Sequence, residues 1–177
     1  MVIETPPKGC YWVDPGKVMA GPYPYSLIEV LLDKGIRAFI NLHGEPYDDR
    51  VKKAAAVRNE KILCCCFPLT DFAAPPAEKM NEILSLLLRM VDHGVPVYIH
   101  CMAGQGRTGM LAGCYLIATG QATPENFVDI IRALRTGAGL SGPSPDNFKQ
   151  VQFAQQFSKE WLREHSVFNV LPILDEV

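Results

Sequence analysis

The chain has no surplus of basic residues, and this excludes several classes of partner. Its 17 lysines and arginines face 19 aspartates and glutamates, so the formal net charge over 177 residues is −2. Proteins that hold nucleic acid or an anionic membrane through overall charge are usually strongly basic. We therefore expect neither nucleic acid nor membrane as a partner, and any attraction for an anion must be local.

Long apolar runs and regularly spaced cysteines are also missing. No stretch reaches the roughly 18 apolar residues needed to cross a bilayer, and MVIETPPKGC at the start does not look like a secretory signal. The six cysteines do not have the spacing of a disulfide framework. These absences favour a cytoplasmic protein. Without repeats or a long linker, residues 1–177 are expected to form one domain, with a core at about 15–165 and an unassigned tail at 166–177.

Strand and helix signals alternate along most of the chain. Short apolar runs that suit buried strands, and one candidate edge strand, lie at 37–42, 61–69, 95–101 and 18–20. Amphipathic or capped segments predict helices at 25–34, 77–93, from about 107, 123–137 and 144–164. In the last two, Thr123-Pro124 and Ser144-Pro145 are interpreted as cap and first helical residue. Alternation of this kind predicts an α/β fold with a largely parallel sheet and helices on both faces.

The most informative segment is VYIHCMAGQGRTGMLAGCYLIATG (97–120), an apolar strand followed by a glycine-rich turn and a helix. Glycines let such a turn bend until successive backbone N–H groups point at one centre, and the helix N-terminus adds free donors and a positive dipole end. Arg107 offers two parallel hydrogen bonds to phosphate oxygens. The segment predicts a cradle for a tetrahedral dianion, with Cys101 at its floor. The cradle would be lined by the backbone amides of Met102, Ala103, Gly104, Gln105, Gly106 and Arg107.

The same field acts on the cysteine. Cysteines at helix N-termini or beside cations ionise far more readily than free cysteine. We therefore expect Cys101 to be largely a thiolate at neutral pH, as nucleophilic attack on phosphorus requires. Thr108 is placed to donate its hydroxyl to the sulfur when the sulfur becomes a leaving group. Cys-x5-Arg alone is a weak signal, but with His100, Gly104 and Thr108-Gly109 around it the pattern is strong.

The stretch HCMAGQGRTG resembles the signature of the protein tyrosine phosphatase superfamily, His-Cys-x2-Gly-x2-Arg-Thr/Ser. The short chain is similar to the atypical dual-specificity phosphatases, over about residues 15–160, including GPYP, INLHGE and PLTDFAAPP. The resemblance implies a four- or five-stranded α/β sheet. It also implies a phosphocysteine intermediate formed without metal or cofactor, and a phosphorylated protein or small phosphoester as substrate. The variable loop positions 102, 103 and 105 carry no lysine, which argues against a phosphoinositide substrate.

Breaking a P–O bond requires a proton for the leaving oxygen. Asp71 in PLTDFAAPP lies at a distance from Cys101 along the chain that is close to the family's, and the resemblance assigns it as general acid and, later, base toward water. The alternative is that Asp71 only caps a turn or the next helix. His100 cannot easily face the sulfur, because adjacent strand residues point to opposite faces. Its expected role is a hydrogen bond that fixes the loop backbone.

Gln150 lies where several relatives carry a polar residue that orients the hydrolytic water, and an exposed helix residue is an equally good interpretation. Cys64, Cys65 and Cys66 are interpreted as small buried apolar residues. A metal site is disfavoured there because only two of the three share a strand face and no Cys-x2-Cys pair exists. Some relatives protect the nucleophile with a disulfide, and the three cysteines and Cys114 all stay open as its partner.

Two alternatives to a protein phosphatase remain. The first is a phosphate-binding module without turnover, which the presence of Cys101, Arg107 and Asp71 together disfavours. The second is a phosphatase acting on an inositol lipid, an inositol phosphate or an RNA 5′ end, which the neutral loop and the absence of a basic surplus disfavour. The sequence leaves the oligomeric state open, as well as the choice between tyrosine-only and dual specificity.

Overall fold

The computed structural model describes residues 5–45 and 50–166. Within them the chain forms one five-stranded sheet with strand order β1-β2-β5-β3-β4. The strands are β1 Tyr11–Asp14, β2 Val18–Gly21, β3 Ala38–Asn41, β4 Leu63–Cys66 and β5 Val97–His100. Only β1 runs antiparallel to its neighbour, so the expected single α/β domain with a largely parallel sheet is confirmed.

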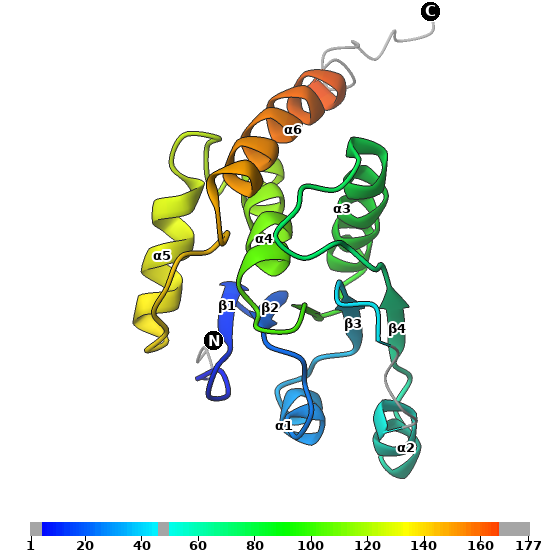
Figure 1. The fold of residues 1–177 in the computed structure, drawn as a ribbon. Coiled ribbons are helices and arrows are strands. Elements are labelled where there is room, and N and C mark those ends of the chain that lie inside the picture. The colour runs from blue at the N-terminus through cyan, green and yellow to red at the C-terminus, as the bar shows by residue number, and fades with distance from the viewer. Residues whose placement is uncertain (1–4, 46–49, 167–177) are drawn as a thin grey trace, which may run out of the picture.

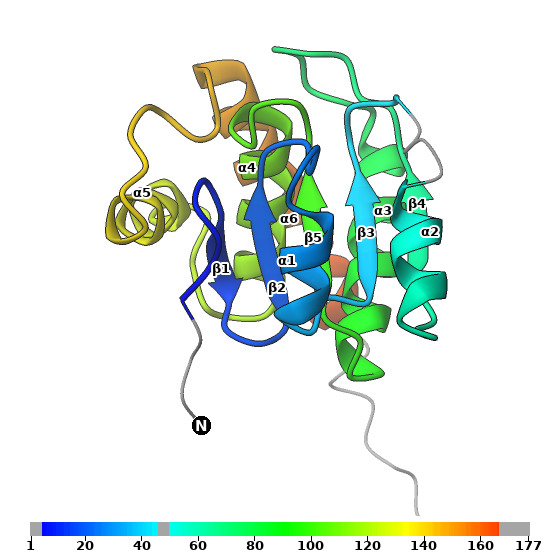
Figure 2. The same cartoon turned by 90° about the horizontal axis from the view of Figure 1, so that it is seen from below.

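Helices cover both faces of the sheet (Figure 1). Those in the described residues are α1 Ile28–Asp33, α2 Arg50–Val57, α3 Ala77–Asp92, α4 Gly106–Ala118, α5 Phe127–Gly137 and α6 Phe148–Ser166. In the view from below, α1 and α2 lie over the near face, and the other helices lie behind the sheet (Figure 2). Across the described stretches, no helix combines the length and the apolarity that a membrane span requires.

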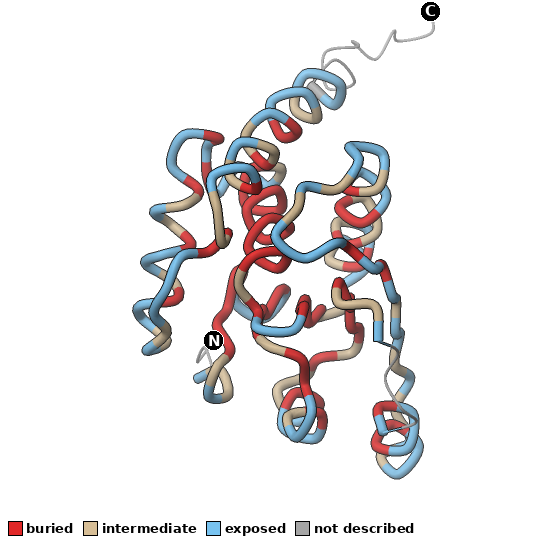
Figure 3. The backbone as a smooth tube through the Cα atoms, viewed as in Figure 1, coloured by how far each residue is buried: buried red, intermediate tan, exposed pale blue. Residues whose placement is uncertain are grey.

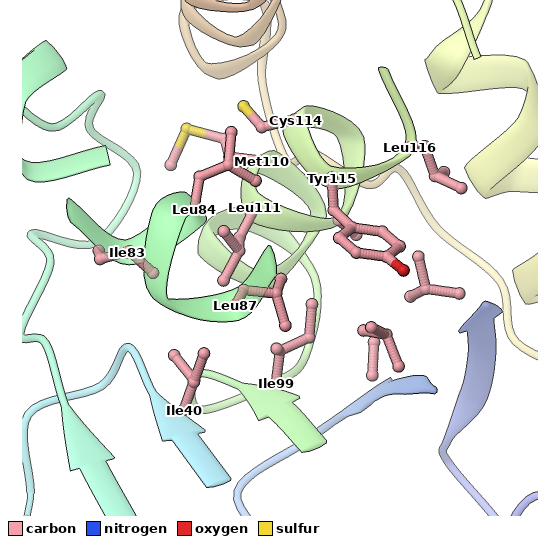
Figure 4. Packing of buried hydrophobic residues seen from close by; sticks show 14 of the residues in the cluster. Ile40, Ile83, Leu84, Leu87, Ile99, Met110, Leu111, Cys114, Tyr115 and Leu116 are labelled. Carbon is pink, nitrogen blue, oxygen red and sulfur yellow. The ribbon is translucent and has the colours of Figure 1, made fainter. Parts of the chain in front are cut away.

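The central helix α4 anchors the larger core. Nearly all of its residues are buried (Figure 3). Its Leu111 lies among Leu84 and Leu87 of α3, above Ile40 and Ile99 of the sheet (Figure 4). Burying side chains of this size contributes about 1.5–3 kcal/mol each. This packing fixes the helix that follows the glycine-rich turn.

The strand predicted within 61–69 is present as β4, but the expectation that it is buried was wrong. β4 pairs only with β3 and forms the sheet edge, and Leu63, Cys64 and Cys66 are exposed. Cys65 points to the opposite face and packs against the larger core, so only this one fits the expected small apolar role. All six cysteines are free thiols in the structure, Cys101 and its four candidate disulfide partners among them.

Two predicted helix starts were also wrong. α5 begins at Phe127 and not at Pro124, because the Thr123 N–H donates to Asn126 Oδ1 (2.7 Å) in a turn that precedes the helix. α6 begins at Phe148, and Asn147 caps it by accepting a hydrogen bond from the Gln150 N–H (3.1 Å). Strand β1 and helix α2 had not been predicted, and most of the unassigned tail, from 167 on, lies outside the described residues.

Candidate active site

The glycine-rich turn lies at the carboxyl edge of the sheet. β2, β3 and β5 are parallel, so their carboxyl ends share one edge (Figure 2). Cys101 follows β5 directly and is only 3% exposed, and α4 begins five residues later at Gly106. In sheets of this kind, ligands bind outside the carboxyl ends of the strands.

The carbonyl groups of the turn are held from outside. The Cys101 carbonyl accepts a hydrogen bond from His100 Nδ1 (2.9 Å), and the Met102 carbonyl accepts one from the Tyr23 N–H (2.9 Å). The Gly104 carbonyl accepts from Arg135 Nη1 (3.2 Å), and the Gln105 carbonyl accepts from Ser144 Oγ (2.9 Å). In a peptide unit the N–H points opposite to the C=O. Carbonyls directed outward therefore turn the N–H groups that follow them toward the inside of the turn, where they make an anion-binding concavity.

Gly104 permits a close approach between this turn and the end of β2. Its φ is +71°, a left-handed conformation that side chains disfavour. A Cβ at this position would overlap the Gly21 carbonyl and lie 2.7 Å from Pro22 N. The predicted need for glycine in the turn thus has a specific cause at this position.

Arg107 is buried and lies beside Asp71. Its Nη1 donates to the carbonyls of Leu69 (3.1 Å) and Leu42 (3.4 Å), and its Nη2 lies 3.2 Å from Asp71 Oδ1. Nε has no hydrogen-bond partner among the described residues. Nη1 therefore fixes the guanidinium to the two carbonyls. The opposite edge of the guanidinium, formed by Nε and Nη2, can donate two parallel hydrogen bonds to an oxyanion.

Asp71 lies in the loop between β4 and α3, with its side chain 53% exposed. Strand pairing brings this loop to the same sheet edge as Cys101, since Leu69 N–H donates to Leu42 at the end of β3 (3.2 Å). The sequence-predicted acid, arginine and cysteine are thus brought together. Their catalytic roles stay predictions.

His100 is fully buried, and its Nδ1–H donates to the Cys101 carbonyl, the contact with the loop backbone that the sequence predicted. Burial lowers the pKa of His100 to about 4, so the ring is neutral at pH 7. Thr108 is also fully buried, and its hydroxyl has no partner among the described residues. Donation of that hydroxyl to the Cys101 sulfur stays a prediction.

Gln150 is not the exposed helix residue that one interpretation expected. It is fully buried, its Oε1 accepts a hydrogen bond from the Asp146 N–H (2.9 Å), and a Cβ on Gly106 would lie 2.9 Å from that oxygen. Its side chain therefore lies against the start of α4. A role in orienting water stays a prediction.

Asp146 is a second carboxylate at this site that the sequence did not point to. A Cβ on Gly106 would overlap its Oδ2. Burial raises the pKa of Asp146, and the charge of Asp71 raises it further. The positive charges of Arg107 and Arg135 and the Gly106 N–H offset part of this rise. In the sequence, an aspartate after proline resembles an ordinary helix start, so no signal distinguished it.

A buried arginine and a cysteine under a ring of inward-facing amides, at the carboxyl edge of a parallel sheet, define the protein tyrosine phosphatase class. Residues 7–141 match the PTP-SAK family, described as "Swiss Army Knife protein, DSP-PTPase phosphatase domain". The chain belongs to this family of phosphatase domains.

Curated relatives agree with this assignment. Protein tyrosine phosphatase type IVA 3 of Bos taurus is 30% identical over 134 residues, which cover 75% of this chain and 70% of that protein. The tyrosine-protein phosphatase CDC14 homolog of Schizosaccharomyces pombe is 26% identical over 139 residues, 77% of this chain and 25% of that protein. The phosphatidylglycerophosphate phosphatase PTPMT1 of Arabidopsis thaliana is 29% identical over 66% of this chain. The matched segment spans only 25% of the CDC14 relative and 34% of the PTPMT1 relative.

Solved structures share the fold. Tk-PTP in its active form superposes with a TM-score of 0.68 at 23% identity, covering 85% of this chain and 97% of that chain. PTPMT1 in complex with PI(5)P superposes with a TM-score of 0.71 at 20% identity, covering 89% and 99%.

Proposed function

We propose that this chain is a cysteine-dependent phosphatase that hydrolyses phosphomonoesters, namely phosphotyrosine and also phosphoserine or phosphothreonine of proteins, through a phosphocysteine intermediate. The observation that carries the proposal is the set of outward hydrogen bonds on the turn around Cys101, together with a buried Arg107 whose Nε has no partner within residues 5–45 and 50–166. Amides and guanidinium arranged before substrate arrives stabilise a phosphoryl transition state without further reorganisation.

In the first step the Cys101 sulfur attacks phosphorus, so an S–P bond forms while the P–O bond to the leaving group breaks. The turn amides and Arg107 bind the non-bridging oxygens. Asp71 supplies the proton that the leaving oxygen takes. Asp71 Oδ1 lies 3.2 Å from Arg107 Nη2, so the proposed acid is held beside the group that binds the phosphate oxygens.

In the second step water attacks phosphorus and the S–P bond breaks. Asp71, now a carboxylate, accepts the proton from water, and inorganic phosphate leaves. The Thr108 hydroxyl donates to the departing thiolate; in support, this hydroxyl is buried and has no other partner in the part of the chain that the structure describes. Gln150, packed against the start of α4, is the proposed orienting group for the water.

Apolar side chains beside the cradle support an aryl phosphate as substrate. Tyr25, Met102 and Phe72 are 53%, 37% and 65% exposed, and the Tyr25 hydroxyl lies 3.5 Å from the Met102 sulfur. Tyr25 precedes α1, Met102 lies in the cradle, and Phe72 follows Asp71, so they come from three separate segments. Exposed aromatic and methionine side chains favour contact with a flat apolar group such as the ring of phosphotyrosine.

A lipid or other non-protein phosphoester is the second candidate. It is favoured by the relative named phosphatidylglycerophosphate phosphatase PTPMT1 and by the structural neighbour in complex with PI(5)P. The neutral side chains at the variable positions of the turn weigh against it, because Met102, Ala103 and Gln105 offer no positive charge to the additional phosphates of a polyphosphorylated head group.

The test is a substrate panel with the wild-type chain. Phosphotyrosyl and phosphoseryl peptides are compared with inositol phosphates and phosphatidylglycerophosphate vesicles, and acid quench traps the phosphocysteine. We expect the phosphotyrosyl peptide to give the highest kcat/KM, and Cys101→Ser to abolish turnover while phosphate still binds. Full activity of Cys101→Ser on p-nitrophenyl phosphate would refute the mechanism. Binding without phosphocysteine would indicate a silent binding module.

A further inference from the structure

Asn147 links the two halves of the site. Its Oδ1 accepts a hydrogen bond from the Gln150 N–H (3.1 Å) at the start of α6, and its Nδ2 donates to the Phe72 carbonyl (3.1 Å) in the loop that carries Asp71. The two partners lie on opposite sides of one amide. Asn147 lies close to the cradle in space and also holds the loop of the candidate acid Asp71, although Asn147 and Phe72 are 75 positions apart in the chain.

The loop needs such support. Asp71 and Phe72 are largely exposed, and Phe72 has a φ of +54°, a conformation that bulky residues rarely adopt without outside restraint. On the N-terminal side the loop is fixed by the Leu69 carbonyl, which accepts from Arg107. On the C-terminal side the Asn147 amide holds the carbonyl next to Asp71. The carboxylate is therefore bracketed by two anchors.

We propose that Asn147 is a positioning residue that keeps the loop of Asp71 over Cys101, so that the carboxyl group meets the leaving oxygen. The inference rests on the proposed phosphatase function and adds a residue to it. Asn147 touches neither substrate nor reacting atoms and acts through the Phe72 carbonyl. Losing the tether lets the loop move, and a proton donor displaced by even 1 Å loses much of its effect.

Helix capping is the competing explanation, because asparagine is among the best N-cap residues. Two variants separate the roles. Asn147→Ser keeps an oxygen that can cap α6, but its side chain is too short to reach the Phe72 carbonyl. Asn147→Ala removes both functions. Lys149→Ser, in the exposed first turn of α6, controls for a substitution in the same helix.

The assay compares two aryl phosphates. The leaving group of phenyl phosphate is a phenolate about as basic as that of tyrosine, whose hydroxyl has a pKa of about 10. Cleavage of this ester therefore depends on the proton donor. p-Nitrophenyl phosphate releases a much more acidic phenol and depends on it less. We expect both Asn147 variants to lose about fivefold in kcat/KM on phenyl phosphate, the worth of one hydrogen bond, and much less on p-nitrophenyl phosphate. Lys149→Ser should match wild type on both esters.

Asp71→Asn supplies the reference, with a loss on phenyl phosphate of about 10²–10⁴-fold. If Asp71→Asn shows this leaving-group pattern but Asn147→Ser behaves as wild type, the positioning role is wrong and the proposed function stands. If only Asn147→Ala is impaired, and in thermal stability alone, Asn147 is a helix cap and nothing more. A wild-type chain that cleaves neither ester overturns the proposed function and this inference with it.

Discussion

A single methyl group added at Gly104 should disable the cradle. Its φ of +71° disfavours any L side chain, and the new Cβ would meet the Gly21 carbonyl and Pro22 N, all backbone atoms that cannot rotate aside. We work the cost of Gly104→Ala from two contributions. The left-handed conformation costs about 1–2 kcal/mol, and overpacking a tight contact costs about 1–3 kcal/mol. Together they take a large share of the 5–15 kcal/mol that typically stabilises a domain.

Gly120→Ala is the matched control. Gly120 has almost the same φ, +72°, but no atom lies within 4 Å of a Cβ built there. It should therefore lose only the conformational contribution, about 1–2 kcal/mol. The difference between the two variants isolates the contact between the turn and the end of β2.

Two measurements decide the outcome. Denaturant unfolding gives the free energy of unfolding, and titration calorimetry with tungstate or phosphate reports the cradle. We expect Gly104→Ala to unfold more easily than Gly120→Ala and to bind the oxyanion at least tenfold more weakly, since relief of the clash moves the turn away from β2 and its amides out of register. Equal loss of stability in the two variants, with oxyanion binding intact in both, would refute the reasoning.

Two more substitutions address charge. Arg107→Lys keeps the positive charge but loses the fixed fork on the Leu69 carbonyl and on the oxyanion, so kcat/KM should fall about 10²–10³-fold; steady-state kinetics on p-nitrophenyl phosphate measure this, and a loss below threefold would contradict it. In the wild-type chain, burial and the charge of Asp71 raise the pKa of Asp146, so the folded state holds this proton more tightly than the unfolded state does. The wild-type chain therefore loses stability as pH rises above about 4, the ordinary aspartate value, and Asp146→Asn removes this loss. The variant should therefore be the more stable at pH 7 and lose this advantage near pH 4, as urea unfolding at both pH values would show; an advantage of equal size at both would contradict it.

Features carried by consecutive residues were predictable. The turn from Cys101 to Arg107 combines a strand end, glycines and a helix start, and each of these is a local preference of the chain. The parallel sheet followed from alternating strand and helix signals. Asp71 was assigned from the resemblance to the dual-specificity phosphatases, through its separation from Cys101 along the chain, and the structure shows that strand pairing brings its loop to the same sheet edge. For the turn and the sheet, short-range sequence and simple topology suffice.

Features set by tertiary packing were not predictable. The apolar run around Cys64 and Cys66 has the composition of a central strand, and only its place at the sheet edge leaves both exposed. Arg135 looks like an exposed cation in the last turn of a helix, yet it is buried and donates to the Gly104 carbonyl. Asn147 likewise resembles an ordinary polar residue near a helix start, and no sequence pattern links it to the loop of Asp71.

The outward hydrogen bonds of the turn come from four different places in the fold. His100 lies on β5, Tyr23 lies between β2 and α1, Arg135 is on α5, and Ser144 precedes α6. Since each carbonyl held outward turns one N–H inward, the anion site depends on all four at once. The signature residues alone do not direct the amides to one centre. The cradle is therefore a tertiary property, and a domain that keeps the signature with its histidine but loses the contacts of Tyr23, Arg135 and Ser144 would keep the cysteine while losing its affinity for phosphate.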